Sequence, residues 1–436
     1  MTYGDSAAVR GRPGRGGVWL RAAIVGWLAA ATAGAAEPER VTVEEAVDEA
    51  LAHNLEFLAA TYEVPLARAE IVTARLRLNP VLTLGGDHLD LLGTHYDDVN
   101  RAGPQEFFVR ADVYFLGGRK RQRRIAVAEL GVDVAELDLR DAVRRLILDV
   151  QRACVEVQSA AAAVDLAVMN RALFRRVVTL NEARVGAGDL ARVDLTRAQI
   201  AELQASNELR RALGAQAIAR NNLSLLLGRR QVPAALVVTG ALRTDEPPLG
   251  IEALREQALR RRPDVRAVHA AQAQTQADIR RQLAEGRADV SVGVEARRQQ
   301  GLAGTGNSLG FFLGVPLRIF DRNQGQVARA RQQALQVGRR RAAIERAVQV
   351  EVENAYVEYR TARALLSSFE GGMLQKAEQV LTTAEYAYLR GEASLIELID
   401  AQRAFNDTRR TYNEARAAFA RSLYGIDAAT GRGSPP

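Results

Sequence analysis

Apolar residues recur three and four positions apart along two long stretches of the chain. The first stretch carries them at Val143, Leu146, Val150, Ala153, Val157, Ala160, Val164 and Ala167. The second carries them at Val348, Val352, Ala355, Tyr359, Ala362, Leu366, Phe369 and Met373. Alternating 3-4 spacing sustained in this way predicts a coiled-coil seam. Residues 119–183 also lack proline, so they can form one helix of about 95 Å at 1.5 Å per residue.

Strict alternation of apolar and polar residues appears in two places in each half of the chain. Residues 289–297 and 309–319 alternate in the second half, and residues 82–85 and 108–115 correspond to them in the first. Such alternation predicts strands with one apolar face and one polar face. A soluble sheet that covers a core gives the same pattern as a strand that faces lipid. The polar, glycine-containing loops between the paired strands favour the lipid-facing interpretation.

The same order of elements occurs twice along the chain. The segment VEEAVDEAL at 43–51 returns as IEALREQAL at 251–259, and GDLARVDLTRAQ at 188–199 returns as GEASLIELIDAQ at 391–402. A repeat period of about 200 residues indicates a duplicated domain rather than a short-period solenoid. We therefore predict five segments: a signal peptide (1–36), a first repeat (37–227), a linker (228–250), a second repeat (251–425) and a disordered tail (426–436).

The first 36 residues have the pattern of a secretory signal peptide. Four arginines are followed by the apolar segment AAIVGWLAAATAGAA, which ends in small residues and is too short to anchor in a bilayer. After residue 36 no stretch reaches roughly 18 consecutive apolar residues, so membrane insertion would have to use strands. Without the first 36 residues the net charge falls from +7 to about +4. No basic block interleaved with aromatics appears, which argues against nucleic-acid binding.

The segment YLRGEASLIELIDAQR at 388–403 places a glycine and two carboxylates in a helical pattern. Gly391 is expected to end one helix in a left-handed conformation. Ser394 is expected to cap the next helix, with Glu397 completing a capping box. Capping does not account for Asp400.

The helix that follows Ser394 has two different faces. At 100° per residue, Glu397 and Asp400 share one side, and an apolar set occupies the other: Leu395, Ile396, Leu398 and Ile399. In the first half, Ala191 occupies the position of Ser394. Asp194, the counterpart of Glu397, therefore lacks a capping partner.

Four strands are too few to close a membrane barrel, whose smallest examples have about eight. Open strand edges are not tolerated in lipid, so closure has to be intermolecular. Three copies would form a twelve-stranded barrel with a pore. The sequence pattern alone does not favour three copies over two or four.

With these features the chain resembles the TolC family of outer-membrane efflux channels over essentially its whole length after residue 36. The resemblance is carried by the strand starts NPVLTL and RADVSV, the strand end VPLRIFDR and the turn Gly-x5-Asp/Glu-x4-Ala-Gln in both halves. The segment FLGGRKRQRRIAVAEL is similar to the strand-to-helix junction of the branch that serves cobalt, zinc and cadmium pumps. The resemblance implies a mainly α homotrimer: a β-barrel in the outer membrane continued by a periplasmic α-helical barrel.

The resemblance also implies site residues. Glu397 and Asp400 match the acidic positions that ring the periplasmic entrance of the channel, and Asp194 matches a position that hydrogen-bonds across helices to keep it closed. The usual arginine partner of that position is replaced by Ala393, and Arg390 is a candidate substitute. The helical tips that dock an adaptor correspond to Gly188, Leu190, Gly391, Ser394 and Leu395.

The implied partners are a periplasmic membrane-fusion adaptor, an inner-membrane resistance-nodulation-division pump, outer-membrane lipid and two further copies of the chain. No cofactor is implied. The junction segment favours divalent heavy metals as the exported substrate, with a multidrug or type I secretion duct as the alternative. No Cys, His or Met cluster indicates a metal site in the duct itself.

Two other classes of protein compete with a channel. An enzyme is disfavoured, because His53, His88, His95 and His269 have no metal-ligand spacing, no Gly-x-Ser-x-Gly motif occurs, and Cys154 lies on an apolar stripe, where an inert core thiol is expected. A periplasmic coiled-coil scaffold without a channel would explain the heptads. It would not explain two pairs of amphipathic strands.

Overall fold

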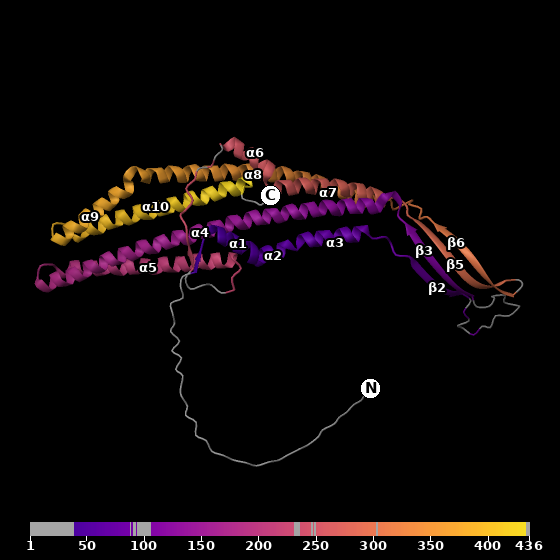
Figure 1. Ribbon diagram of the computed structural model, residues 1–436, viewed down its shortest axis with the longest axis horizontal. Helices are drawn as coiled ribbons and strands as arrows, with labels where there is room; N and C mark the ends of the chain where they lie inside the picture. The colour runs from indigo at the N-terminus through magenta and orange to yellow at the C-terminus, as the bar shows by residue number, and fades with distance from the viewer. Residues whose placement is uncertain are drawn as a thin grey trace, which may run out of the picture. The chain divides into compact units, whose positions relative to one another are not determined.

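The computed structural model describes residues 39–87, 89, 93, 106–230, 236–245, 247, 250–301 and 304–432. This part of the chain is mainly helical (Figure 1). Its helices are α1 (Val43–His53), α2 (Leu55–Thr61), α3 (Glu63–Arg75), η1 (Gly117–Arg119), α4 (Lys120–Ala187), α5 (Arg192–Leu226), α6 (Ile251–Arg261), α7 (Pro263–Glu285), α8 (Gln324–Ser368), η2 (Phe369–Met373), α9 (Leu374–Arg390) and α10 (Leu395–Thr430). Its strands are β1 (Glu39–Val41), β2 (Val81–Asp87), β3 (Glu106–Phe115), β4 (Leu236–Val238), β5 (Val290–Gly301) and β6 (Gly304–Gly314). The predicted signal peptide and most of the loop before β3 lie outside the described residues.

Helix α4 is the longest element, with 68 residues and therefore a length of about 102 Å at 1.5 Å per residue. It contacts α3, α5, α7 and α10. Val150, Val157 and Ala167 of its predicted seam are buried, because an apolar position at 3-4 spacing stays on the side that faces other helices. The prediction of one long helix in this region is confirmed.

The second predicted seam is confirmed as far as Phe369, but its last position, Met373, does not pack against other helices as a seam residue would. Val348, Leu366 and Phe369 are buried, but Met373 is half exposed. The helix is interrupted at η2, where Gly372 has a φ of +94° that a residue with a side chain rarely adopts. The adjacent glycines of FEGGM were the sequence signal for this break.

Four strands form an antiparallel sheet in the order β2-β3-β5-β6. Cross-strand neighbours such as Leu84, Val109 and Ala296 lie in one row, so successive rows alternate between an apolar face and a polar face. The alternation predicted from the sequence is confirmed. Strands β2 and β6 are the two edges, and the sheet is not closed within the chain.

The predicted limits of the last strand were wrong. The strand was expected over 309–319, but β6 begins at Gly304 and ends at Gly314. Its first residues pair with the end of β5 in a segment that was expected to be a loop. Pro316 lacks a backbone N–H to donate to a ladder, and this explains why the strand ends before it.

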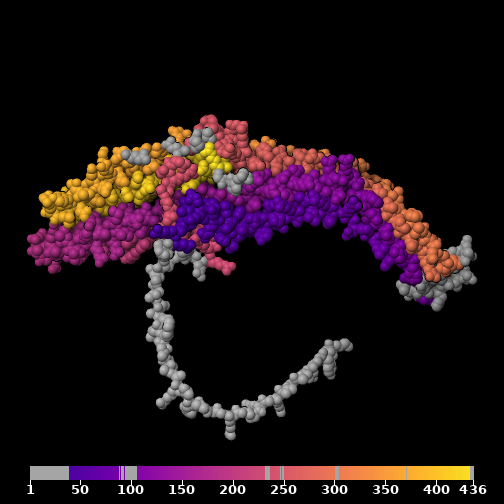
Figure 2. Space-filling view, in the orientation of Figure 1, coloured from indigo at the N-terminus to yellow at the C-terminus, as the bar shows by residue number. Residues whose placement is uncertain are grey.

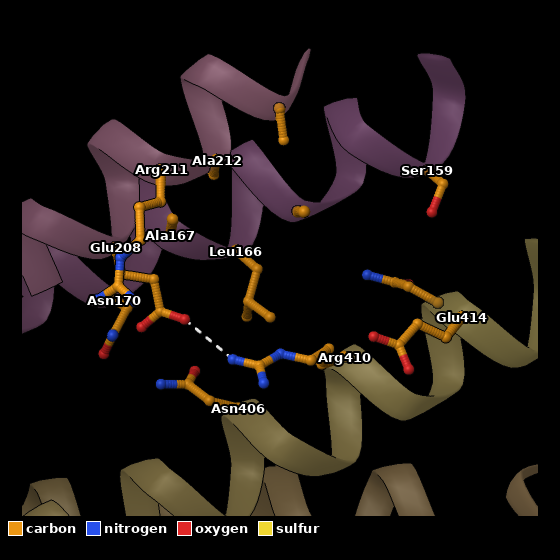
Figure 3. Close-up of a pocket in the computed structure, with 13 residues that line it drawn as sticks. Ser159, Leu166, Ala167, Asn170, Glu208, Arg211, Ala212, Asn406, Arg410 and Glu414 are labelled. Carbon is orange, nitrogen blue, oxygen red and sulfur yellow. Dashed lines mark hydrogen bonds and ion pairs between the residues drawn. The ribbon is translucent and has the colours of Figure 1, made fainter. Parts of the chain in front are cut away.

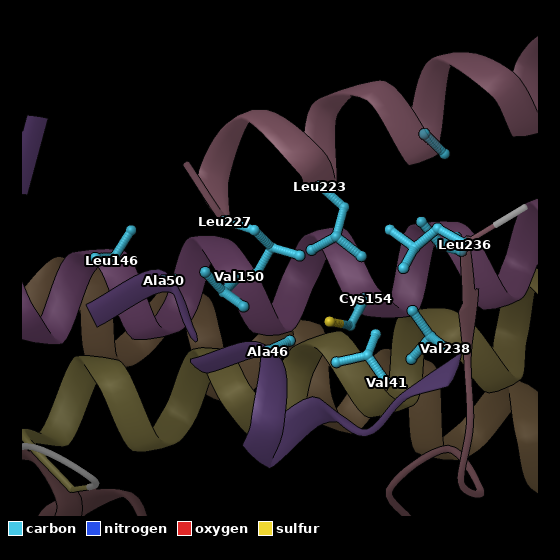
Figure 4. Close-up of a cluster of buried hydrophobic side chains, with 12 residues drawn as sticks. Val41, Ala46, Ala50, Leu146, Val150, Cys154, Leu223, Leu227, Leu236 and Val238 are labelled. Carbon is cyan, nitrogen blue, oxygen red and sulfur yellow. The ribbon is translucent and has the colours of Figure 1, made fainter. Parts of the chain in front are cut away.

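A buried apolar cluster joins β1 and α1 to α4, α5 and β4 (Figure 4). Strands β1 and β4 pair in parallel, from Glu39 with Leu236 to Val41 with Val238. Strand β4 therefore lies inside the segment predicted to be only a linker. Cys154 is fully buried in this cluster, and its burial together with the nearby Glu44 carboxylate raises the pKa of its thiol to about 12. The prediction of an inert core cysteine is confirmed.

The predicted start of a disordered tail at residue 426 was also wrong. Helix α10 continues to Thr430, and Ile426, Ala428 and Ala429 are buried, because their apolar side chains complete the packing against α6 and α8.

Two buried arginines hold the C-terminal turn of α10. Arg144 of α4 donates to the Ala428 carbonyl (3.1 Å), and Arg262 donates to the Ala429 carbonyl (3.4 Å). Arg262 also forms two hydrogen bonds with the Asp264 carboxylate, of 3.0 and 2.7 Å. Cations at a helix C-terminus satisfy carbonyl groups that have no partner within the helix. None of the helices in the described part of the chain is both long and apolar enough to cross a membrane.

Candidate functional site

Two helical turns lie close together, and they and the helix starts that follow them carry the residues predicted for the gate and for adaptor docking (Figure 2). The first, residues 188–191, joins α4 to α5, and the second, residues 391–394, joins α9 to α10. Gly188 (φ +85°) and Gly391 (φ +79°) end the preceding helices in the left-handed conformation, as predicted for Gly391. A Cβ atom at either glycine would have open space around it. The backbone conformation, not crowding, therefore explains the glycines.

The predicted capping box at the second turn is confirmed. The Glu397 Oε2 atom accepts hydrogen bonds from the Ser394 backbone N (2.6 Å) and hydroxyl (3.0 Å), and the Ser394 hydroxyl accepts one from the Glu397 N (3.3 Å). The hydrogen bond from the Ser394 backbone lowers the pKa of the Glu397 carboxyl. At the first turn Ala191 gives no side-chain cap, as the sequence indicated.

The two aspartates have different surroundings. The Asp400 side chain is 68% exposed, and its nearest cation is Arg403 at 4.0 Å. Asp194 is half-buried and forms an ion pair of 3.1 Å with Arg197 of its own helix. Within the chain Arg390 does not replace the missing partner of Asp194, because its guanidinium lies over the Tyr386 ring at 4.4 Å.

The apolar side of α10 is narrower than predicted. Leu395 and Leu398 are buried, but Ile396 is 53% exposed. Leu395 and Leu398 pack with Val177 of α4 and Tyr388 of α9, because these helices cover only one side of α10. Leu190 in the first turn is half-buried.

Side chains that the sequence analysis missed link the two turns. The buried Tyr388 hydroxyl donates to the Asn181 Oδ1 atom at 2.5 Å. Arg184 donates to the carbonyls of Tyr388 (3.3 Å) and Leu389 (2.8 Å) at the C-terminus of α9. Burial raises the pKa of Tyr388, although the hydrogen bond with Asn181 and the Arg184 charge oppose the rise. The end of α4 and the end of α9 are thus joined by polar contacts as well as apolar ones.

Farther along the helices from these turns, a groove of about 310 Å³ lies between α4, α5 and α10 (Figure 3). The Arg410 guanidinium lies across it and pairs with the Glu208 carboxylate at 2.9 Å. Asn170 and Asn406 line the same space. Ser159 and Glu414 also line the groove, but no hydrogen bond joins the Ser159 hydroxyl to a base in the part of the chain that the structure describes.

Metal-ligating residues are not grouped in the described part of the chain. No set of three or more His, Cys, Asp or Glu side chains in it has the arrangement to hold a metal ion. His269 contacts Glu345 at 3.0 Å. His88 and His95 lie outside the described residues.

The chain is similar to known proteins over most of its length. The family described as outer membrane efflux protein matches residues 46–229 and 254–432. The cobalt-zinc-cadmium resistance protein CzcC of Cupriavidus metallidurans is 27% identical over 373 residues, which are 85% of this chain and 85% of that protein.

Solved structures share the fold. The chain superposes on CusC with a TM-score of 0.73 at 20% identity, over 90% of this chain and 92% of that one. It superposes on the outer membrane channel CmeC of Campylobacter jejuni with a TM-score of 0.75 at 14% identity, over 89% of this chain and 85% of that one. CmeC is described as an outer membrane channel, and at these identities the two structures show that the fold is shared.

Proposed function

Because the chain belongs to the outer membrane efflux protein family, we propose that it is the exit duct of a tripartite system that exports divalent heavy-metal cations. As a member of this family it lies in the outer membrane and extends into the periplasm. The observation that supports a metal substrate is the similarity to the cobalt-zinc-cadmium resistance protein over 85% of the chain. In this proposal the duct is passive, and the pump selects the substrate.

The free edges of the sheet support assembly as a homotrimer. Strands β2 and β6 alternate in direction with their neighbours, so β6 of one copy would run antiparallel to β2 of the next. Three copies would then close a twelve-stranded barrel and leave no edge in lipid. The two stretches matched by the family, 46–229 and 254–432, support the proposed repeats and the linker between them.

The two adjacent turns form the proposed periplasmic gate. Asp400 is exposed, and Glu397 lies one helical turn before it on the same side. In a trimer three copies of each would surround one axis, favour cations and disfavour anions. Asp194, paired with Arg197, is the third proposed gate residue.

The surface around the same turns is the proposed docking site for the periplasmic adaptor, which would connect the duct to an inner-membrane resistance-nodulation-division pump. Its residues are the exposed Gly188, Gly391 and Ser394 and the half-buried Leu190, whereas Leu395, also predicted to take part, is buried and would only support this surface from beneath. The side-by-side position of the two turns supports this proposal, because an adaptor tip could contact both at once.

Deletion and complementation test the proposal. A strain without the protein should become several-fold more sensitive to cobalt, zinc and cadmium salts, with little change toward hydrophobic drugs, and the wild-type chain should restore resistance. Sensitisation to drugs alone would instead identify a multidrug duct. Electron microscopy of the detergent-extracted protein should show hollow trimers, whereas a protein that is washed from membranes by salt would be a scaffold.

A further inference from the structure

The polar face of the sheet carries charged side chains that the proposed gate does not involve. In the described strands these are four carboxylates and two guanidiniums: Asp87, Glu106, Asp112, Glu295, Arg110 and Arg297. Arg297 pairs with Asp87, Glu106 and Glu295, and Arg110 pairs with Asp112 and lies directly across the strands from Glu295.

Arg297 joins three strands. Its Nη1 atom donates to the carboxylates of Asp87 in β2 (2.9 Å) and Glu106 in β3 (3.0 Å), and its Nε atom donates to Glu295 in β5 (3.0 Å). Its guanidinium also lies over the Phe108 ring at 4.7 Å. One cation therefore contacts three carboxylates, and the four groups together keep a net charge of about −2.

Glycines on this face make room for the arrangement. A Cβ atom at Gly85 would lie 2.3 Å from the Phe108 ring, so only glycine lets Phe108 lie flat across β2 beneath Arg297. In the same way a Cβ atom at Gly293 would lie 2.3 Å from the Asp112 Oδ1 atom, which Arg110 binds at 2.8 Å. The charged groups are fixed in place by packing and are not free surface side chains.

The next residue along β5 provides a comparison. Arg298 lies in the row of Phe107 and Asn307, on the other face of the sheet. It is exposed, and no ion pair joins it to another residue that the structure describes. Substitution of either arginine removes the same charge, but of these two residues only Arg297 lies beside carboxylates on the polar face.

We propose that Arg297 limits the cation selectivity of the strand section of the duct, because its positive charge offsets one of the three negative charges of Asp87, Glu106 and Glu295 that passing ions would meet. This rests on the proposed function, in which the polar face of the sheet lines the pore. Without the guanidinium, the net charge of the cluster would change from about −2 to about −3 in each copy. A ring of such negatively charged clusters favours cations over anions.

Purified protein in planar lipid bilayers under a potassium chloride gradient tests the inference. Arg297→Gln should raise the cation-to-anion permeability ratio about twofold or more, measured from the reversal potential. Arg298→Gln is the control and should leave the ratio near that of the wild type. Arg297→Lys should restore most of the wild-type ratio, because the ammonium keeps the charge. Equal shifts for Arg297→Gln and Arg298→Gln would overturn the inference.

A second variant covers the case in which Arg297→Gln does not assemble. Asp87 is the most exposed of the three carboxylates, with half of its side chain accessible. Because Asp87→Asn would change the net charge of the cluster from about −2 to about −1, it should lower the cation-to-anion permeability ratio, and an unchanged ratio would contradict a role of this cluster in ion selectivity. If the wild-type protein forms no ion-conducting pores, the proposed function itself is overturned. If it forms pores whose ion selectivity the substitutions leave unaltered, only the role of Arg297 is overturned.

Discussion

Tyr388 and Asn181, 207 positions apart in the chain, are joined by a buried hydrogen bond of 2.5 Å that connects α9 to α4. Tyr388→Phe removes the donor and leaves the Asn181 amide buried without this partner. We expect the free energy of unfolding to fall by about 1–3 kcal/mol, the usual cost of an unsatisfied buried group. Thermal or denaturant unfolding measures it. Tyr386→Phe is the control, because Tyr386 is 55% exposed on the same helix, and equal losses in both variants would show that the hydrogen bond does not stabilise the tip.

The two proposed gate carboxylates should be separable. Asp400→Asn removes an exposed charge without touching the helix cap, so it should weaken block by multivalent cations and leave the melting temperature unchanged. Replacement of both Glu397 and Asp400 by Ala should also raise the single-channel conductance. Bilayer recordings measure both effects, with Glu378→Gln, an exposed carboxylate on α9, as the control. Unchanged conductance and block in the double variant would reject the gate.

The difference between the two N-caps predicts opposite effects of serine and alanine. Ser394→Ala should destabilise the start of α10 by about 0.5–2 kcal/mol, because the Glu397 backbone N–H loses its acceptor, the Ser394 hydroxyl. Ala191→Ser should stabilise the start of α5, since Ala191 already has the extended conformation of a cap (φ −69°, ψ 142°). Thermal unfolding of the two variants should move in opposite directions. A fall in both would mean that the first turn cannot accept the hydroxyl group.

Stability should depend on the ionisation of Asp264. Burial alone would raise the pKa of its carboxyl, but the hydrogen bonds and charge of Arg262 outweigh burial and hold it below the ordinary value of 3.8. A carboxyl with a lowered pKa stabilises the fold above its unfolded-state pKa and loses that contribution as the pH falls. The stability difference between wild type and Asp264→Asn should therefore shrink as the pH falls from 6 toward 3.

Melting temperatures across this pH range provide the measurement. Glu256→Gln is the control, because Glu256 is an exposed partner of Arg260 on α6. A difference between wild type and Asp264→Asn that stays constant with pH would show that the Arg262 ion pair does not contribute through ionisation.

The long helices, the strands and the capping box were predictable because each is determined by residues close together in sequence. Spacing determines which face of α4 is buried, and the Ser394 to Glu397 interval is a local signal. The limits of β6 were not predictable in this way, because a strand ends where pairing with its neighbour ends. Pro316 was the one local clue.

The contacts between the two turns were missed for a related reason. Asn181 and Arg184 find their partners in a helix about 200 residues away, and no local pattern specifies that pairing. One signal was present: Asn170 and Asn181 continue the 3-4 spacing of the α4 seam. A polar residue at such a position often fixes the register of packed helices. The identity of the proposed gate residues came from family resemblance, and the structure adds that the Asp400 side chain is largely exposed and that Glu397 caps its own helix.

The arginine contacts at the end of α10 have a consequence for biosynthesis. Arg144 and Arg262 each bond to a carbonyl of residues 428 and 429, so neither can complete its contacts until the chain has been made almost to that point. Contacts of such large sequence separation form slowly, and the emerging polypeptide stays exposed to aggregation meanwhile. A periplasmic chaperone that shields the unfinished chain would therefore have to remain bound until translocation is nearly complete.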